Sequence, residues 1–107
     1  GDALPVAKAG EVRTGPAVIR SNVSGDCVET YDIEILRVLD SDGTQNLLIQ
    51  VVDDALIQQT GGIVQGMSGS PILQDGKIVG AVTHVMVNEP TKGYGILIEN
   101  MLAQAGR

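Results

Sequence analysis

The chain has 107 residues and a formal net charge of −6, and 43% of its residues are hydrophobic while only 2% are aromatic. This length and composition suit one compact domain with a core of Val, Ile and Leu, and they exclude a disordered tail. Lysine and arginine form no cluster along the chain, so the basic surface that nucleic acids or anionic lipids require is missing. We expect no nucleic-acid partner and no membrane contact from this segment.

Cys27 is the only cysteine. It permits neither an internal disulfide nor a multi-cysteine zinc site, and we expect no metal and no cofactor. The sequence contains no apolar run of about 18 residues and no charged leader followed by an apolar stretch, which are the marks of a membrane span and a signal peptide. Either feature would have to lie outside these residues.

Short apolar runs separated by turn residues predict strands in preference to helices. The first strand is expected within 12–23, where Pro16 suggests an edge position or an irregular start. In the second, Tyr31, Ile33 and Ile35 alternate with acidic residues until the pattern shifts at Leu36, which predicts a bulge. Further strands are expected at 47–52, 71–74, 77–87 and 94–98, with turns at 24–26 and 41–43.

Two short helical segments interrupt this pattern. Asp53 and Asp54 precede a five-residue stretch that ends near Gly61 and Gly62. An acidic cap in front and glycine behind predict a short helix or helical turn. A second short helix is expected over 100–105, before Gly106.

Asp75-Gly76 predicts a two-residue hairpin, because both central positions of a type I′ turn need positive φ. If Gln74 faces Lys77 across that turn, an unbroken antiparallel register sets Ser68 opposite Thr83. Directly opposed side chains share a face at about 5 Å between Cβ atoms. Thr83 is therefore the predicted neighbour of Ser68.

The same register sets Met67 opposite His84, which is the only histidine of the chain. The His84 side chain would then point to the other face from Ser68, unless a bulge slips the register by one residue. Three interpretations of His84 stay open: a satisfied core or cleft-wall histidine, a substrate contact, or a substitute base. The last requires the slipped register.

The sequence Gly66-Met67-Ser68-Gly69-Ser70-Pro71 sets one serine between glycines. Glycines on both sides allow a tight bend that exposes a hydroxyl and directs amide N–H groups at a substrate carbonyl, as in nucleophilic serine sites. A plain turn between two strands is the alternative, since Gly, Ser and Pro all favour turns. Ser70, which is followed by proline, is expected to pack or hydrogen-bond locally.

The run 60–72 (TGGIVQGMSGSPI), continued by 75–85 (DGKIVGAVTHV) and 93–96 (GYGI), closely resembles the SpoIVB peptidases, serine peptidases of endospore-forming bacteria. The resemblance implies an all-β fold: a six-stranded antiparallel barrel like one half of a trypsin-like protease, with a short helical turn and a short C-terminal helix. It also implies an exported, PDZ-bearing parent protein in the space between the mother-cell and forespore membranes. Such proteins cleave themselves and a regulator of an intramembrane protease.

For the site, the resemblance implies that Ser68 is the nucleophile and that Asp53 is the triad acid, although Asp53 is equally well explained as a helix cap. By analogy with trypsin-like enzymes, the backbone N–H groups of Gly66 and Ser68 would hold the oxyanion. Thr83 and His84 would lie on the strand that lines the substrate cleft. Met67 would either cover the cleft floor or fill a gap in the core.

One departure from the family is plain. Its catalytic histidine lies upstream of the nucleophile, and this chain has no histidine before Ser68. Without a general base a serine hydroxyl is a poor nucleophile. We therefore interpret residues 1–107 as the C-terminal half of a peptidase domain, inactive alone, whose partners are a peptide substrate and its own upstream half. An isolated half is expected to expose an apolar patch and self-associate.

A different class of function stays open beside the peptidase. A non-catalytic β-barrel module that binds an extended peptide at a sheet edge would show the same strand pattern. In that case Ser68 would be an ordinary turn residue.

Overall fold

The computed structural model describes residues 5–21, 29–39, 45–61, 67–86 and 88–105. Its six strands are β1 (Gly15–Ser21), β2 (Glu29–Val38), β3 (Leu47–Val51), β4 (Pro71–Gln74), β5 (Lys77–Val85) and β6 (Lys92–Leu97). A 3-10 turn, η1 (Ala9–Glu11), and two helices, α1 (Asp54–Thr60) and α2 (Ile98–Ala105), complete the described elements. The turns expected at 24–26 and 41–43, and also Cys27, Gly62, Gly66 and Gly106, lie outside the described residues.

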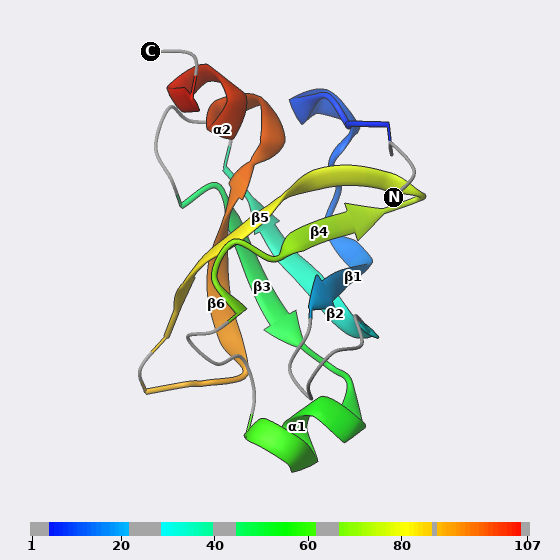
Figure 1. Cartoon of the computed structure of the whole chain (residues 1–107), viewed down its shortest axis with the longest axis vertical. Coiled ribbons are helices and arrows are strands. Elements are labelled where there is room, and N and C mark those ends of the chain that lie inside the picture. Colours follow the sequence, from blue (N-terminus) through cyan, green and yellow to red (C-terminus); the bar gives the residue numbers. More distant parts are fainter. Residues whose placement is uncertain (1–4, 22–28, 40–44, 62–66, 87, 106–107) are drawn as a thin grey trace.

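The strands form a closed antiparallel barrel in the order β1-β2-β3-β6-β5-β4, with α1 and α2 at opposite ends (Figure 1). Alternation of buried and exposed residues produces this arrangement: in β2, Tyr31, Ile33 and Ile35 are buried, whereas Asp32 is exposed. Aliphatic side chains from all six strands fill the interior, including Ile19, Ile49 and Val82. The predicted fold class, a six-stranded antiparallel barrel, is confirmed.

The bulge predicted at Leu36 is present. Ile35 pairs with Ile49 and Arg37 pairs with Leu48, so Leu36 is the extra residue on β2. A bulge bends and twists the strand that carries it, which helps a sheet to close on itself.

The hairpin turn is also present, with φ of 54° at Asp75 and 78° at Gly76. The predicted register is correct for two pairs, Gln74–Lys77 and Leu73–Ile78. It is wrong beyond them, because Ile72 pairs with Gly80 and Val79 is an extra residue on β5. An unbroken register therefore does not reach Ser68. The ladder ends at Pro71–Ala81, so the pairings inferred for Ser68 with Thr83 and for Met67 with His84 are not formed.

The helices begin close to where they were expected. Asp53 is the N-cap of α1 and Gly61, with φ of 80°, is its C-cap, as the acidic and glycine residues predicted. The C-terminal helix α2 begins at Ile98, two residues before the predicted start, because β6 ends at Leu97. Neither described helix is long and apolar enough to span a membrane.

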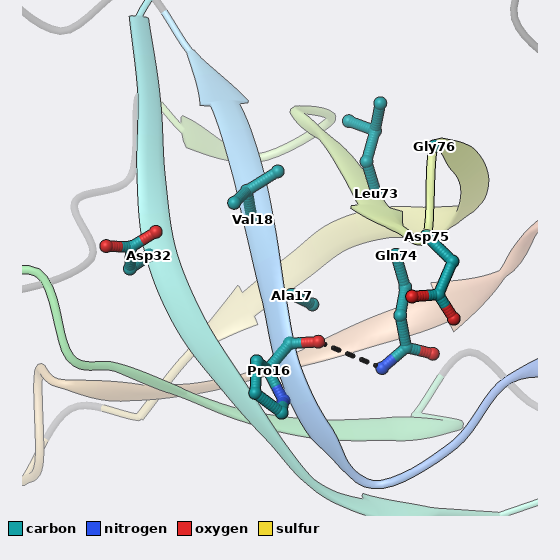
Figure 2. Close-up of a pocket in the computed structure, with 8 residues that line it drawn as sticks. All are labelled: Pro16, Ala17, Val18, Asp32, Leu73, Gln74, Asp75 and Gly76. Atoms are coloured by element: carbon teal, nitrogen blue, oxygen red, sulfur yellow. Dashed lines mark hydrogen bonds between the residues drawn. The ribbon is translucent and has the colours of Figure 1, made fainter.

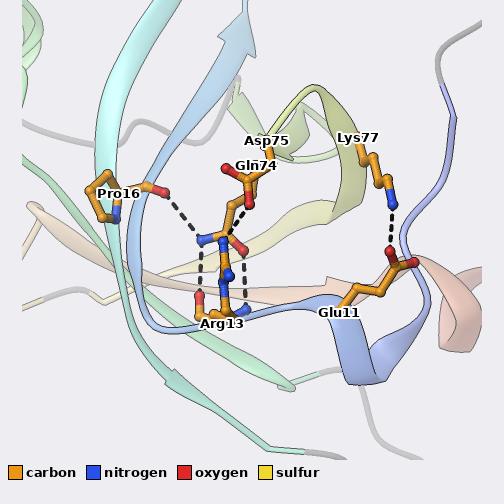
Figure 3. Close-up of polar contacts among 6 residues, drawn as sticks. All are labelled: Glu11, Arg13, Pro16, Gln74, Asp75 and Lys77. Atoms are coloured by element: carbon orange, nitrogen blue, oxygen red, sulfur yellow. Dashed lines mark hydrogen bonds and ion pairs between the residues drawn. The ribbon is translucent and has the colours of Figure 1, made fainter.

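The segment before β1 is joined to the hairpin between β4 and β5. Ala7 N–H donates to Ile78 O (2.8 Å), and Ile78 N–H donates to Pro5 O (2.9 Å). The Lys77 ammonium donates to the Glu11 carboxylate (Figure 3). This hydrogen bond is the main reason that the pKa of Glu11 lies below its ordinary value.

Gln74 closes the gap between β1 and β4 where their ladder ends. Its Nε2 donates to Arg13 O (2.9 Å) and to Pro16 O (3.1 Å), while its Oε1 accepts from Arg13 N–H (3.1 Å) (Figure 3). Arg13 also pairs with Asp75 at 2.6 Å, with both side chains exposed. A buried amide side chain thus supplies the hydrogen bonds that backbone pairing would otherwise make.

Candidate active site

The Ser68 turn lies in the chain between the buried residue Met67 and the start of β4. Met67 is fully buried in the core, and Ser68, the next residue, is exposed. Gly69 has φ of 89°, a conformation that favours glycine, and Ser70 N–H donates back to Met67 O (3.0 Å). The chain thus bends sharply at Ser68, with one neighbour anchored inside the barrel.

Two backbone hydrogen bonds fix this turn against β5. Gly69 N–H donates to Val82 O (2.7 Å), and Val82 N–H donates to Ser70 O (2.9 Å). Within the described residues, neither the amide nor the hydroxyl of Ser68 makes a hydrogen bond. No described residue therefore occupies either group, which is compatible with nucleophilic attack and oxyanion binding.

Ser70, the other serine of the motif, has a different environment. Its side chain is half-buried and its hydroxyl donates to Ser21 Oγ (3.1 Å), at the end of β1. The partner lies on the neighbouring strand β1, far from Ser70 in the sequence, whereas a local partner was expected. This hydrogen bond joins the residue before β4 to the end of β1.

Thr83 and His84 follow Val82 on β5, and Val82 is the anchoring residue, whose backbone bonds to Gly69 and Ser70 of the turn. His84 is exposed and Thr83 is half-buried. The His84 Nδ1 and Thr83 Oγ1 atoms lie 3.0 Å apart, and the Thr83 hydroxyl donates to Tyr94 O (3.2 Å). The extra residue Val79 shifts β5 by one position against β4, but the ladder between them ends at Pro71–Ala81 and does not extend to Ser68. The three interpretations of His84 therefore stay predictions.

Asp53 accepts two backbone hydrogen bonds. Its Oδ1 accepts from Leu56 N–H, which caps α1, and its Oδ2 accepts from Asp32 N–H in β2, both at 3.2 Å. The carboxylate therefore caps the helix and ties it to the barrel. The role of triad acid, and the oxyanion role of Gly66, which lies outside the described residues, stay predictions.

Substitution of Asp53 tests whether its two backbone hydrogen bonds stabilise the fold. We expect Asp53→Ala to lower the free energy of unfolding by about 1–2 kcal/mol, because two backbone donors lose their acceptor. Asp53→Asn should cost less, since its amide oxygen still accepts from Leu56 N–H. Urea denaturation of the three proteins measures the difference. Equal stability of Asp53→Ala and the parent would contradict the cap.

A cavity of about 380 Å³ lies between the beginning of β1 and the hairpin (Figure 2). Pro16 and Val18 line one side, and Leu73 and Gln74 the other. Its lining includes none of the predicted site residues that the structure describes. It lies at the opposite end of β4 from the Ser68 turn, so it is separate from the candidate active site.

Comparison with known proteins identifies the family. The profile of the family described as SpoIVB peptidase S55 matches residues 1–102. The chain belongs to this family. The barrel of this S55 chain is similar to the crystal structure of the Rv3671c protease from M. tuberculosis in its active form, with a TM-score of 0.68 and 16% identity. The match covers 95% of the S55 chain and 46% of the Rv3671c protease chain, so the S55 chain spans about half the length of that protease. A search among curated proteins gave no match.

Sequence reasoning missed three features around the candidate site. The carbonyl of Tyr94, the anchoring residue Val82 and the partner Ser21 are ordinary strand residues, and nothing in their sequence context marks them. They matter only because the barrel brings β1, β5 and β6 next to the motif.

Proposed function

We propose that this chain is the nucleophile-bearing, C-terminal half of a serine endopeptidase. Membership of a peptidase family gives the class of reaction. The observation that carries the serine mechanism is the Ser68 turn, in which an exposed serine follows a buried residue and precedes a glycine of positive φ. A likeness that covers 46% of a protease supports the interpretation as one half.

In the proposed reaction the Ser68 hydroxyl oxygen attacks the carbonyl carbon of the peptide while its proton passes to a base. The amide N–H groups of Ser68 and Gly66 stabilise the negative charge that develops on the carbonyl oxygen. The proton then passes to the leaving amine, and water hydrolyses the acyl-enzyme in a second round. Because no histidine precedes Ser68, the base comes from the upstream half, and the isolated chain is inactive.

The finer biology remains part of the proposal. By resemblance, the parent protein is exported to the space between mother-cell and forespore membranes, where it cleaves itself and a regulator of an intramembrane protease. Self-association of the isolated half also stays a prediction. Large apolar side chains that are exposed in the described part of the chain are Val6, Leu36, Leu39, Val52 and Leu102.

The alternative, a module that binds peptides at a sheet edge, is less well supported. Each of the six described strands already has two neighbours in the closed barrel. Addition of a peptide strand requires an unpaired edge. The exposed serine also has no role in such a module.

Serine-directed labelling tests the proposal. A fluorophosphonate forms a covalent bond only with a serine activated by its site. We expect the protein that carries both halves to be labelled at Ser68, as mapped by mass spectrometry, and the Ser68→Ala variant to remain unlabelled. Ser70→Ala is the matched control and should still be labelled. Label on Ser70, or none on either serine, would overturn the serine mechanism.

A further inference from the structure

A second bulge in β5 places two neighbouring side chains in contact. Val82 pairs with Gly95 and His84 pairs with Tyr94, so Thr83 is an extra residue on β5. Consecutive side chains of a regular strand point to opposite faces and do not meet. A bulge breaks that alternation and re-aims a side chain. This explains how Thr83 Oγ1 and His84 Nδ1 come to lie 3.0 Å apart.

The hydrogen bonds of Thr83 bear on which ring nitrogen of a neutral His84 carries the hydrogen. A threonine hydroxyl has one proton, and here it is donated to Tyr94 O at 3.2 Å. When that proton points at Tyr94 O, the same oxygen offers His84 only a lone pair, and Nδ1 then carries the hydrogen that joins them. In a neutral imidazole only one nitrogen is protonated, which leaves Nε2 with a free lone pair. This arrangement favours the Nδ1–H tautomer.

The position of His84 relative to the serine turn follows from the backbone. Ser70 and Val82 are joined by a hydrogen bond, and the pairs nearer the hairpin are Pro71–Ala81 and Ile72–Gly80. Val82 O also accepts from Gly69 N–H, so both residues that follow Ser68 are bonded to Val82, two residues before His84 on β5. His84 is exposed, and Nδ1 is the nitrogen engaged with Thr83. Nε2 is therefore the nitrogen that an incoming group meets.

We propose that Thr83 is a positioning residue that holds His84 as the Nδ1–H tautomer, and that His84 Nε2 accepts a hydrogen bond from a donor side chain of the peptide bound beside Ser68. The substrate part of this inference rests on the proposed function. A fixed acceptor favours a side chain that can donate, such as an amide. It disfavours a carboxylate of the same shape, whose lone pairs would face that of Nε2.

The tautomer can be tested on the 107-residue chain itself. His84 is the only histidine, so a ¹⁵N-labelled sample gives a single pair of ring nitrogens. In alkaline buffer we expect the Nδ1 resonance to be that of a protonated nitrogen and the Nε2 resonance that of an unprotonated one. Thr83→Val, which keeps the shape but lacks the hydroxyl, should switch the ring to the Nε2–H form. Thr83→Ser should restore the Nδ1–H form.

Amide backbone spectra of the same samples show whether each variant is folded. Should Thr83→Val fail to fold, the parent and Thr83→Ser still decide the matter, since both must show the Nδ1–H form. An Nε2–H tautomer in the parent, or an unchanged tautomer in folded Thr83→Val, would overturn the role of Thr83.

The substrate part is tested with peptides in the protein that carries both halves. Pairs of peptides that differ only by Asn or Asp at one position are compared, one position at a time, on either side of the cleaved bond. We expect a preference in kcat/KM of about tenfold for Asn at one position. His84→Ala should abolish this preference, Thr83→Val should weaken it and Thr83→Ser should keep it.

Other results would separate the possible failures. Equal kcat/KM for Asn and Asp at every position overturns the acceptor role of His84. Loss of hydrolysis of every peptide in His84→Ala also overturns it, because His84 would then act on Ser68 itself. A parent protein that hydrolyses no peptide overturns the proposed function together with the substrate part, whereas the tautomer measurement judges Thr83 independently.

Discussion

Replacing Ser68 by alanine should reduce peptide hydrolysis by the protein that carries both halves by about 10⁴-fold or more. The loss is large because the covalent step has no attacking atom, and only binding and oxyanion stabilisation remain. Folding should be almost unaffected, since Ser68 is exposed and makes no hydrogen bond within the described residues. The measurement is kcat/KM on a peptide, with the unfolding transition as a check of structure.

The matched control is Ser70→Ala. That substitution removes the hydroxyl that donates to Ser21 Oγ, which should cost about 1 kcal/mol of stability. Most of the peptidase activity should remain, because the turn itself is fixed by backbone hydrogen bonds. A Ser68→Ala protein that still cleaves peptide at the parental rate would refute the nucleophile assignment.

Most strands could be predicted from the sequence because their signals are local. In β2 the alternation of apolar and acidic residues gives both the strand and its bulge at Leu36. Asp75-Gly76 gives the hairpin, because its two φ angles are positive. The capping residues Asp53 and Gly61 give α1. Each of these depends on residues within one turn or one strand.

The two bulges of β5 could not be predicted, because both are set by contacts between strands. Val79 is extra relative to β4 and Thr83 is extra relative to β6. The sequence of β5 alone continues without a break, so its register was expected to be regular. The bulge at Val79 precedes Val82, which is bonded to the Ser68 turn, and the bulge at Thr83 accompanies the contact of Thr83 with His84.

The candidate site shows the same division. The motif around Ser68 predicts a sharp bend, and the structure places Ser68 exposed in a turn. For Asp53 the sequence allowed a cap, from its place in front of the helix, and the family resemblance implied a triad acid. The structure supplies the hydrogen bond of the cap, from Leu56 N–H, and a second one from Asp32 N–H in β2. The surroundings of Ser68 and Asp53 therefore had to come from the three-dimensional structure, because the residue types alone do not give them.

Gly80 lies beside the extra residue Val79 on β5. Among the described glycines, it is the one at which an added Cβ would come closest to another atom. A Cβ added at Gly80 would lie 2.0 Å from Ile96 O and 3.0 Å from Ile96 C. Both are backbone atoms, so relief requires that two paired strands separate. We expect Gly80→Ala to lower the free energy of unfolding by about 3 kcal/mol. Urea denaturation measures this change.

Two other glycines provide a graded control. At Gly10 an added Cβ meets nothing within 4 Å, and Gly10→Ala should change stability by less than about 0.5 kcal/mol. At Gly95 the nearest atom, at 2.8 Å, is the end of the flexible Ile72 side chain, and the nearest backbone atom, Ala81 O, lies at 3.0 Å, so the cost should be intermediate. The expected order of destabilisation is thus Gly80, Gly95, Gly10. Because Thr83 and His84 lie farther along the same strand, forced separation of β5 from β6 should also weaken the contact of Thr83 with Tyr94 O. A Gly80→Ala protein with parental stability would show that β5 can move away from β6 at little cost, and the bulge at Thr83 would then be a poor anchor for His84.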